Sequence, residues 1–297
     1  MKSSFSSFLI VVVLFFSLEG VYGQKRPKEP SWKMPPVEGP NLSYKTFESE
    51  SAGEEVSYLL FLPPGYEQAK EERFPVVYWL HGIGGSQRGV PQICSNITKA
   101  IKAKKMPATI FVFANGMVDS FYCDSLNEDR PVESMIVKDL IPHVDETYRT
   151  VATREGRMIE GFSMGGFGAG HLGFKYPELF GSVSIIDGAL IDLGMMKRRH
   201  SHLFKKIFDE KDGVFEAEHP LFLLEKNGAD IKGRTVIRQA VGKIQEPNQA
   251  LHDAMTEKGI DHEYESFPEA GHAVNVIYDK LGDKNWAFYE RAFAGVK

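Results

Sequence analysis

Apolar and polar residues alternate in two segments early in the main body of the chain, Tyr44–Glu50 and Glu55–Leu62. A period of two is typical of half-buried strands, so these segments predict two antiparallel strands. The next segment, Phe74–Leu80, is a continuous apolar run, which indicates a strand buried on both faces. Further strands are predicted at Thr109–Phe113, Met158–Gly161, Ser182–Ile186, Arg234–Arg238 and His262–Phe267.

Helical patterns separate several of these strands. They lie at Ile93–Lys104, Ser134–Thr147, Ala169–Tyr176 and Pro247–Lys258. Strands that alternate with helices over this length predict an α/β fold with a mostly parallel central sheet, helices on both faces and antiparallel N-terminal strands. No internal repeat or second domain is evident, so residues 45–297 are expected to form one domain.

The N-terminus has the pattern of a secretory signal peptide. Lys2 precedes the apolar run Phe8–Phe16, and small residues near Gly23 suit cleavage before Gln24. Residues 1–23 are therefore expected to direct a secreted or periplasmic location, with no membrane association after cleavage; an uncleaved anchor is the alternative. Residues 24–44 are rich in proline and charge, which predicts a linker or extended arm.

Composition narrows the possible partners. The chain has 297 residues, of which 42% are hydrophobic, and its net charge is −5. These values suit a soluble globular protein and provide no basic field for nucleic acid. Cys94 and Cys123 are the two cysteines; export would favour oxidation, but their pairing is left open because the sequence does not show whether they lie within bridging distance.

The segment Gly161–Gly165 has the form G-x-S-x-G around Ser163. It follows a predicted strand and precedes a helical segment, which is the context of a nucleophile elbow. In such a turn, glycines avoid steric clashes and the serine hydroxyl lies at a helix N-terminus, where developing negative charge is favoured. The alternative is a glycine-rich loop that only turns the chain.

A nucleophilic serine requires a base and an oxyanion hole. His272 follows the last predicted strand, where this architecture places its base, although a surface histidine is the simpler interpretation. Met164 and Ile83 are the candidates to donate oxyanion N–H groups, with Gly82 next, because 82–85 forms a glycine-rich loop after a buried strand. A plain glycine turn is the alternative for that loop.

The acid that orients the base is the least determined member. Glu246 is the first candidate because it is the only carboxylate in the loop after strand 234–238. Asp187 and Asp192, which follow the preceding strand, are alternatives, as is a site without an acid. Among the remaining histidines, His143 and His171 are expected to be structural, whereas His81 is a candidate to line the site.

These features occur together with further motifs: Val76–Gly85, Ala114–Gly116, Asp139–Pro142, Tyr148–Thr150 and Pro177–Ser184. In this order, the chain resembles the esterase D-like branch of the α/β-hydrolases, which includes secreted feruloyl and acetyl xylan esterases. The resemblance implies that Ser163 and His272 are catalytic and that Ile83 and Met164 form the oxyanion hole. The chain departs from the family pattern at the acid, because segment 242–246 contains no aspartate.

The expected function is that of a serine carboxylesterase acting on a small-molecule or polysaccharide-linked ester, of feruloyl or acetyl type. Phe162 and Tyr122 are candidates for an aromatic wall that contacts substrate, although each is equally suited to the core. Acyl transfer to a sugar and a non-catalytic binding protein on the same scaffold are the alternatives. No metal or cofactor is implied, since no ligand-spaced cluster or phosphate-binding motif occurs in the sequence.

Overall fold

The computed structural model describes residues 31–296, whose strands form one sheet in the order β1-β2-β4-β3-β5-β6-β7-β8. The first two pairings, β1 with β2 and β2 with β4, are antiparallel, and the others are parallel. This confirms the predicted α/β fold class. The strands are β1 (Leu42–Ser49), β2 (Glu54–Phe61), β3 (Val76–Leu80), β4 (Ile110–Ala114), β5 (Arg157–Phe162), β6 (Ser182–Ile186), β7 (Val236–Val241) and β8 (Glu263–Ser266).

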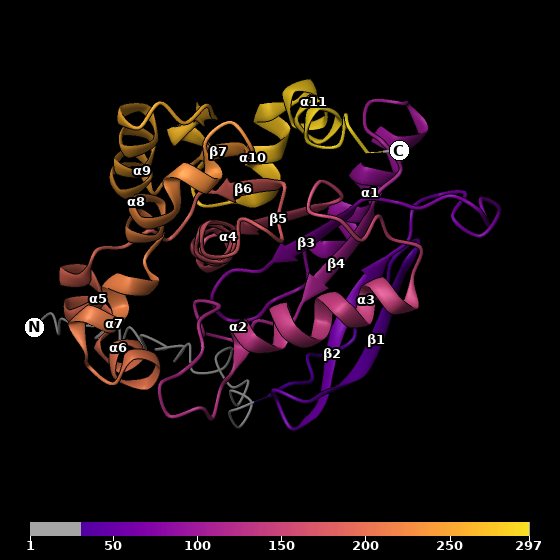
Figure 1. Cartoon of the computed structure of the whole chain (residues 1–297). Helices are drawn as coiled ribbons and strands as arrows, with labels where there is room; N and C mark the ends of the chain where they lie inside the picture. Colours follow the sequence, from indigo (N-terminus) through magenta and orange to yellow (C-terminus); the bar gives the residue numbers. More distant parts are fainter. Residues whose placement is uncertain (1–30, 297) are drawn as a thin grey trace, which may run out of the picture.

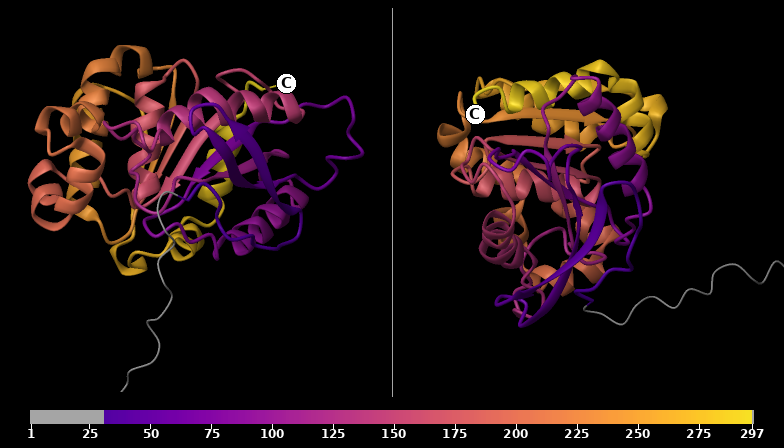
Figure 2. Two further views of the ribbon diagram at one scale, coloured as in Figure 1. Left: turned by 90° about the horizontal axis from the view of Figure 1, so that it is seen from below. Right: turned by 90° about the vertical axis from the view of Figure 1, so that its right-hand side faces the viewer.

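Helices cover both faces of the twisted sheet (Figures 1 and 2). On one side lie α1 (Val90–Lys102), α10 (Val274–Leu281) and α11 (Asp283–Ala292). The other side carries α2 (Val132–Ser134), the π-helical η1 (Met135–Leu140), α3 (Ile141–Thr147), α4 (Met164–Lys175), α8 (Pro220–Ile231) and α9 (Gln245–Glu257). The 3-10 helix η2 (Pro268–Ala270) follows β8.

Besides α8, three short helices between β6 and β7 were not predicted from the sequence. They are α5 (Leu193–Arg199), α6 (Ser201–Phe208) and α7 (Asp212–Glu218), which form a group at the left of Figure 1, at the opposite end from β1 and β2. A signal for α6 exists, because Leu203, Phe204, Ile207 and Phe208 recur at helical spacing, and all four are buried.

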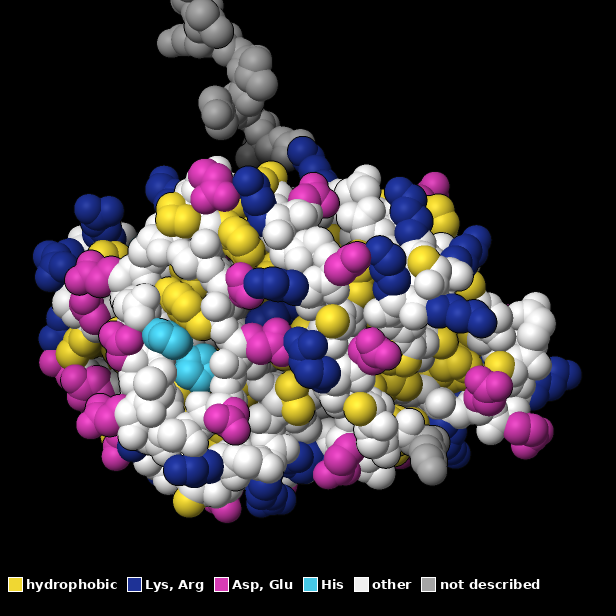
Figure 3. Space-filling model, turned by 90° about the horizontal axis from the view of Figure 1, so that it is seen from above, with side chains coloured by type: hydrophobic (Ala, Val, Ile, Leu, Met, Phe, Trp, Pro, Cys, Tyr) yellow, Lys and Arg dark blue, Asp and Glu magenta, His cyan; other side chains and the backbone are white. Residues whose placement is uncertain are grey.

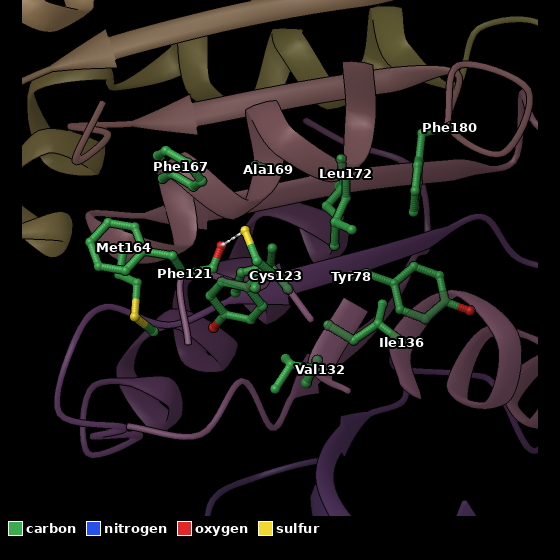
Figure 4. Close-up of a cluster of buried hydrophobic side chains, with 14 of the residues drawn as sticks. Tyr78, Phe121, Cys123, Val132, Ile136, Met164, Phe167, Ala169, Leu172 and Phe180 are labelled. Atoms are coloured by element: carbon green, nitrogen blue, oxygen red, sulfur yellow. Dashed lines mark hydrogen bonds between the residues drawn. The ribbon is translucent and has the colours of Figure 1, made fainter. Parts of the chain in front are cut away.

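The apolar run in β3 sends alternate side chains to opposite faces of the sheet. Tyr78 belongs to the core beneath α4, whereas Val77 and Trp79 belong to the core beneath α1, α10 and α11. Figure 4 shows the first of these cores, in which Phe167 and Leu172 of α4 lie among the packed side chains. The sheet therefore separates two apolar cores, and Trp79 projects into the second.

The two cysteines lie in different cores. Cys94 is on α1, on one face of the sheet, and Cys123 lies in the core on the other face, where its Sγ contacts the carbonyl oxygen of Phe121 at 3.6 Å (Figure 4). Both are buried and free. The question that the sequence left open is thus answered: the sheet stands between the two thiols, so they do not pair.

The described part of the proline-rich segment lies against the sheet. Trp32 and Met34 are buried, and their backbone groups bond to Ser57 of β2: the Ser57 N–H donates to the Trp32 carbonyl at 2.8 Å, and the Met34 N–H donates to Ser57 Oγ at 2.9 Å. Residues 1–23, the predicted signal peptide, lie outside the described residues. Within residues 31–296, none of the helices has both the length and the apolar character needed to cross a bilayer.

Seen from above, the surface of the molecule carries intermixed acidic and basic side chains (Figure 3). On this face neither sign of charge gathers into a continuous field, which agrees with the near balance of 35 basic and 40 acidic residues in the sequence. Charge on this face therefore offers no broad attraction for a polyanion.

Candidate active site

Ser163 lies in the sharp turn between β5 and α4. Its φ and ψ angles of 59° and −117° are unusual for a residue with a side chain, and such strain persists only where neighbouring contacts hold it. The Ser163 N–H donates to the Ile186 carbonyl at 3.0 Å, and its carbonyl accepts from the Ala189 N–H at 2.8 Å. A side chain at Gly165 would overlap the Leu80 carbonyl, which explains why the elbow requires glycine there.

His272 lies beside this serine, in the loop that follows β8 and η2. Its Nε2 is 2.9 Å from Ser163 Oγ, a hydrogen-bond distance in which the hydroxyl donates to the ring nitrogen. The Phe162 ring packs against the imidazole with centroids 4.6 Å apart. The structure thus brings together the nucleophile and base predicted from the sequence.

The third partner is Asp187, at the end of β6. Its Oδ2 accepts a hydrogen bond from His272 Nδ1 at 2.6 Å, and the carboxylate is fully buried. The loop after β7 supplies three further donors: Oδ1 accepts from the N–H groups of Gly242 and Ile244 at 2.9 Å, and Oδ2 from Lys243 at 3.1 Å. Four hydrogen bonds therefore stabilise the negative charge and fix the imidazole orientation.

Glu246, the first candidate from the sequence, does not occupy this position. It lies in the first turn of α9 with its side chain exposed, and the loop between β7 and α9 offers N–H groups instead of a carboxylate. Asp192, another candidate, caps α5 by accepting the Met195 N–H. Asp187, named as an alternative, is the carboxylate that bonds to His272, and the support for a non-catalytic protein that rested on a missing carboxylate is removed.

The loop after β3 approaches the nucleophile closely. A Cβ added to Gly82 would lie 3.3 Å from Ser163 Cβ, so the glycine allows the loop to contact the elbow. Among the loop and turn hydrogen bonds of residues 31–296, none is donated by the N–H of Ile83. Met164 is the first residue of α4, where an N–H has no acceptor within the helix. These two N–H groups are the candidates to bind a developing oxyanion.

His81 lies beneath this loop and supports it. It is 1% exposed; its Nδ1 donates to the Gly82 carbonyl at 2.8 Å, and its Nε2 accepts from the Gly116 N–H at 3.1 Å. Burial lowers the pKa of His81 from 6.5 to about 4, so the ring is neutral and holds a single tautomer. His81 was a candidate to contact substrate, but both ring nitrogens bind backbone instead.

Phe162 and Tyr122, the two residues of the predicted aromatic wall, lie in different environments. Phe162 lines a cavity of about 190 Å³ beside the elbow. Tyr122 is fully buried below the loop, and its hydroxyl donates to the His81 carbonyl at 3.0 Å, so it cannot reach a substrate there. The cavity is lined by Trp79, Gly82, Ile83, Ser86, Gly89, Val90, Ile93, Phe162 and Val274.

A second cluster of ionisable side chains lies apart from this cavity and could be mistaken for a metal centre. Glu133, His171 and Glu218 bring ligand-type atoms within 4.8 Å of one another. Lys175 already neutralises the two carboxylates, with its Nζ 2.6 Å from Glu218 and 2.9 Å from Glu133. Although burial would raise the pKa of Glu133, hydrogen bonding and charge from His171 and Lys175 lower it to about 2. The cluster is therefore a charge-compensated network that joins α4 to α2 and α7.

Comparison with known proteins identifies the family to which the chain belongs. The family model described as "Putative esterase" matches residues 49–296. An endo-1,4-beta-xylanase/feruloyl esterase of Xylanibacter ruminicola is 31% identical over 159 residues, which is 50% of this chain but only 22% of that protein. An acetyl esterase of Caldicellulosiruptor saccharolyticus is 24% identical over 213 residues, covering 68% of this chain and 78% of the relative.

Solved structures share the fold. A ferulic acid esterase superposes with a TM-score of 0.71 at 20% identity, covering 85% of this chain and 98% of the other. An S-formylglutathione hydrolase of Staphylococcus aureus gives 0.67 at 16% identity, with coverage of 84% and 98%. The predicted resemblance to feruloyl esterase and esterase D-like α/β-hydrolases is confirmed: the chain belongs to the Putative esterase family of serine hydrolases.

Proposed function

We propose that this member of the esterase family hydrolyses carboxylic esters, with Ser163 as nucleophile, His272 as general base and Asp187 as the residue that orients the base. The observation that carries the proposal is the unbroken hydrogen-bond chain from Ser163 Oγ through the imidazole to the buried carboxylate. A neutral imidazole bonded in this way has Nε2 free of a proton, as a base requires.

In the proposed reaction, Ser163 Oγ attacks the ester carbonyl carbon while His272 Nε2 takes the hydroxyl proton. The carbonyl oxygen gains negative charge, which the N–H groups of Ile83 and Met164 stabilise. The tetrahedral intermediate collapses as Nε2 gives its proton to the leaving alcohol, which leaves an acyl-serine. Water then attacks with the same base, and the carboxylic acid and free Ser163 are released.

We further propose that the substrates are acyl esters linked to carbohydrate, of feruloyl or acetyl type. The support is the activity in the names of the relatives, a feruloyl esterase and an acetyl esterase. An exported enzyme would meet such polymers outside the cell, and residues 1–23 carry the signal-peptide pattern. N-terminal sequencing of protein recovered from the medium or periplasm tests this location; a chain that retains Met1 and stays in the cytoplasm would contradict it.

The experiment for the proposed activity compares the wild type with Ser163→Ala on p-nitrophenyl acetate and methyl ferulate. We expect turnover on at least one ester, reduced by roughly 10⁴-fold or more in the variant. Ser201→Ala, at an exposed serine on α6, is the matched control and should retain full activity. Folded wild-type protein with no turnover above Ser163→Ala on either ester would reject hydrolysis. With a free sugar added to the assay, release of acylated sugar in place of free acid would indicate acyl transfer.

A further inference from the structure

The cavity beside Ser163 has no role in the bond-breaking steps. We propose that it is the acyl-binding pocket, that it accepts an acyl group with one planar ring, and that Trp79 is the residue that determines this preference. This inference rests on the proposed esterase function. It assigns the acyl side of the ester to the cavity and the alcohol side to solvent.

The position of the cavity connects it to the reaction. Its wall includes Gly82 and Ile83 of the oxyanion loop, Phe162, which precedes the nucleophile, and Val274, two residues after His272. Phe162 contacts the His272 ring, with centroids 4.6 Å apart. A group covalently attached to Ser163 Oγ would therefore be adjacent to the cavity mouth.

Its size indicates the length of the acyl group. The volume is about 190 Å³, and an apolar cavity of roughly 150 Å³ is sufficient to bind benzene in another protein. One ring with a short linker therefore fits, whereas an acetyl group would leave most of the cavity unfilled. Because unfilled apolar space forgoes favourable contacts, the cavity favours the aryl group.

The side chains that line the cavity suit the acyl half of the ester and not a sugar on the alcohol half. Apart from Ser86, which is exposed, no lining side chain offers a hydroxyl, amide or charged group, and the remaining lining is apolar side chains and glycine backbone. The one buried side-chain donor, Trp79 Nε1, already donates to the Tyr278 hydroxyl at 3.1 Å. A sugar would lose its hydrogen bonds to water here without replacement, whereas an aryl group would not.

Trp79 is held by a buried chain of hydrogen bonds. The Tyr278 hydroxyl that accepts from Trp79 donates in turn to Glu160 Oε1 at 2.6 Å, and Glu160 Oε2 accepts from Arg238 at 2.8 Å. Tyr278 lies one turn along α10 from Val274, another lining residue. These hydrogen bonds thus hold the Trp79 indole of β3 against α10. Tyr278 is a positioning residue that acts through Trp79.

The test fills the cavity and varies the two halves of the ester separately. Val90 is a buried lining residue on α1, so Val90→Phe enlarges a side chain into the space. Wild-type protein should hydrolyse methyl cinnamate with a kcat/KM at least tenfold above that for methyl acetate. Val90→Phe should lower the ratio of the cinnamate value to the acetate value by tenfold or more.

The matched control is Val276→Phe, which makes the same change at an exposed position of α10 outside the cavity lining and should alter neither value. Benzyl acetate carries the ring on the alcohol side and should not respond to Val90→Phe. Loss of benzyl acetate activity with cinnamate activity retained would overturn the assignment, as would equal losses on all three esters in a folded variant.

Tyr278→Phe tests whether Tyr278 positions Trp79. It also provides a second test of the pocket if Val90→Phe does not fold. It removes the acceptor for Trp79 Nε1 while retaining the ring, so KM for methyl cinnamate should rise severalfold, and by more than KM for methyl acetate. Equal changes for both esters would reject the role of Trp79. The absence of any Ser163-dependent hydrolysis by the wild type would instead reject the underlying esterase function.

Discussion

Asp187 and His272 are 85 positions apart in the chain, yet Asp187 Oδ2 accepts a hydrogen bond from His272 Nδ1 at 2.6 Å. The carboxylate ends β6, and the histidine follows β8, with β7 lying between these two strands in the sheet. The loop after β7 bridges the gap by donating three backbone N–H groups to the same carboxylate. The acid is therefore held by the sheet on one side and by a neighbouring loop on the other.

Replacing this acid should preserve the geometry and disable the base. Asp187→Asn offers its amide to Nδ1, which favours the wrong imidazole tautomer, and we expect kcat to fall by about 10³–10⁴-fold. The measurement is kcat on p-nitrophenyl acetate, with folding checked by circular dichroism. Glu246→Gln, at the exposed carboxylate of α9, is the control and should be fully active. A large loss of kcat in Glu246→Gln with full activity in Asp187→Asn would show that Glu246 orients His272 instead.

The contact between Gly82 and Ser163 makes the oxyanion loop sensitive to a single methyl group. In Gly82→Ala the new Cβ would lie 3.3 Å from Ser163 Cβ, which forces the loop or the elbow to shift by a few tenths of an ångström. Because catalysis depends on donor placement, kcat should fall by roughly tenfold to a hundredfold with KM changed less. Gly213→Ala on α7, where a Cβ meets nothing within 4 Å, should leave kcat unchanged; equal kinetics in both variants would contradict the assignment of this loop.

His219 should make the fold sensitive to acid. It caps α8 by accepting the Leu221 N–H at 3.2 Å, and burial lowers its pKa from 6.5 to about 4. The unfolded chain therefore binds the proton first, and the stability present at pH 7 is lost as the pH falls from 6.5 towards 4. The His81 ring, with the same pKa direction, contributes in the same sense.

His219→Asn isolates this contribution, because asparagine also caps helices but does not titrate. Urea unfolding at pH 7 and pH 4 should show that the wild type loses up to about 3 kcal/mol more than the variant over this range. Indistinguishable pH dependence in the two proteins would mean that the buried imidazole does not contribute.

Breaking the buried ion pair between Glu160 and Arg238 should lower the free energy of unfolding strongly. Both are at most 1% exposed, and the carboxylate also accepts from the hydroxyls of Tyr278 and Tyr289. Glu160→Gln leaves the guanidinium without its counter-charge, which should lower the free energy of unfolding by about 3–5 kcal/mol. Glu265→Gln breaks an exposed ion pair with Lys284 and should cost less than about 1 kcal/mol; comparable losses in urea unfolding would contradict this account.

The sequence by itself determined the strands, the elbow and the histidine that lies beside its serine. All eight predicted strands are present, because alternation or continuous apolar character reflects which faces are covered, and that requirement acts locally. Ser163 was identifiable because the glycine pattern follows from the steric demands of one turn. His272 was identifiable because chain order places the base after the last strand.

Only the tertiary structure decided the acid, the supporting roles of His81 and Tyr122, and the cavity. Nothing local distinguishes Asp187 from Glu246, since the choice depends on which carboxylate reaches the imidazole across three strands and accepts the N–H groups of the loop after β7. The side-chain direction of Tyr122 depends on the glycines that it packs against, and the cavity depends on how α1 and α10 meet the face that carries Trp79. These properties arise from contacts between segments that are distant in the sequence, so periodicity and motif spacing cannot predict them.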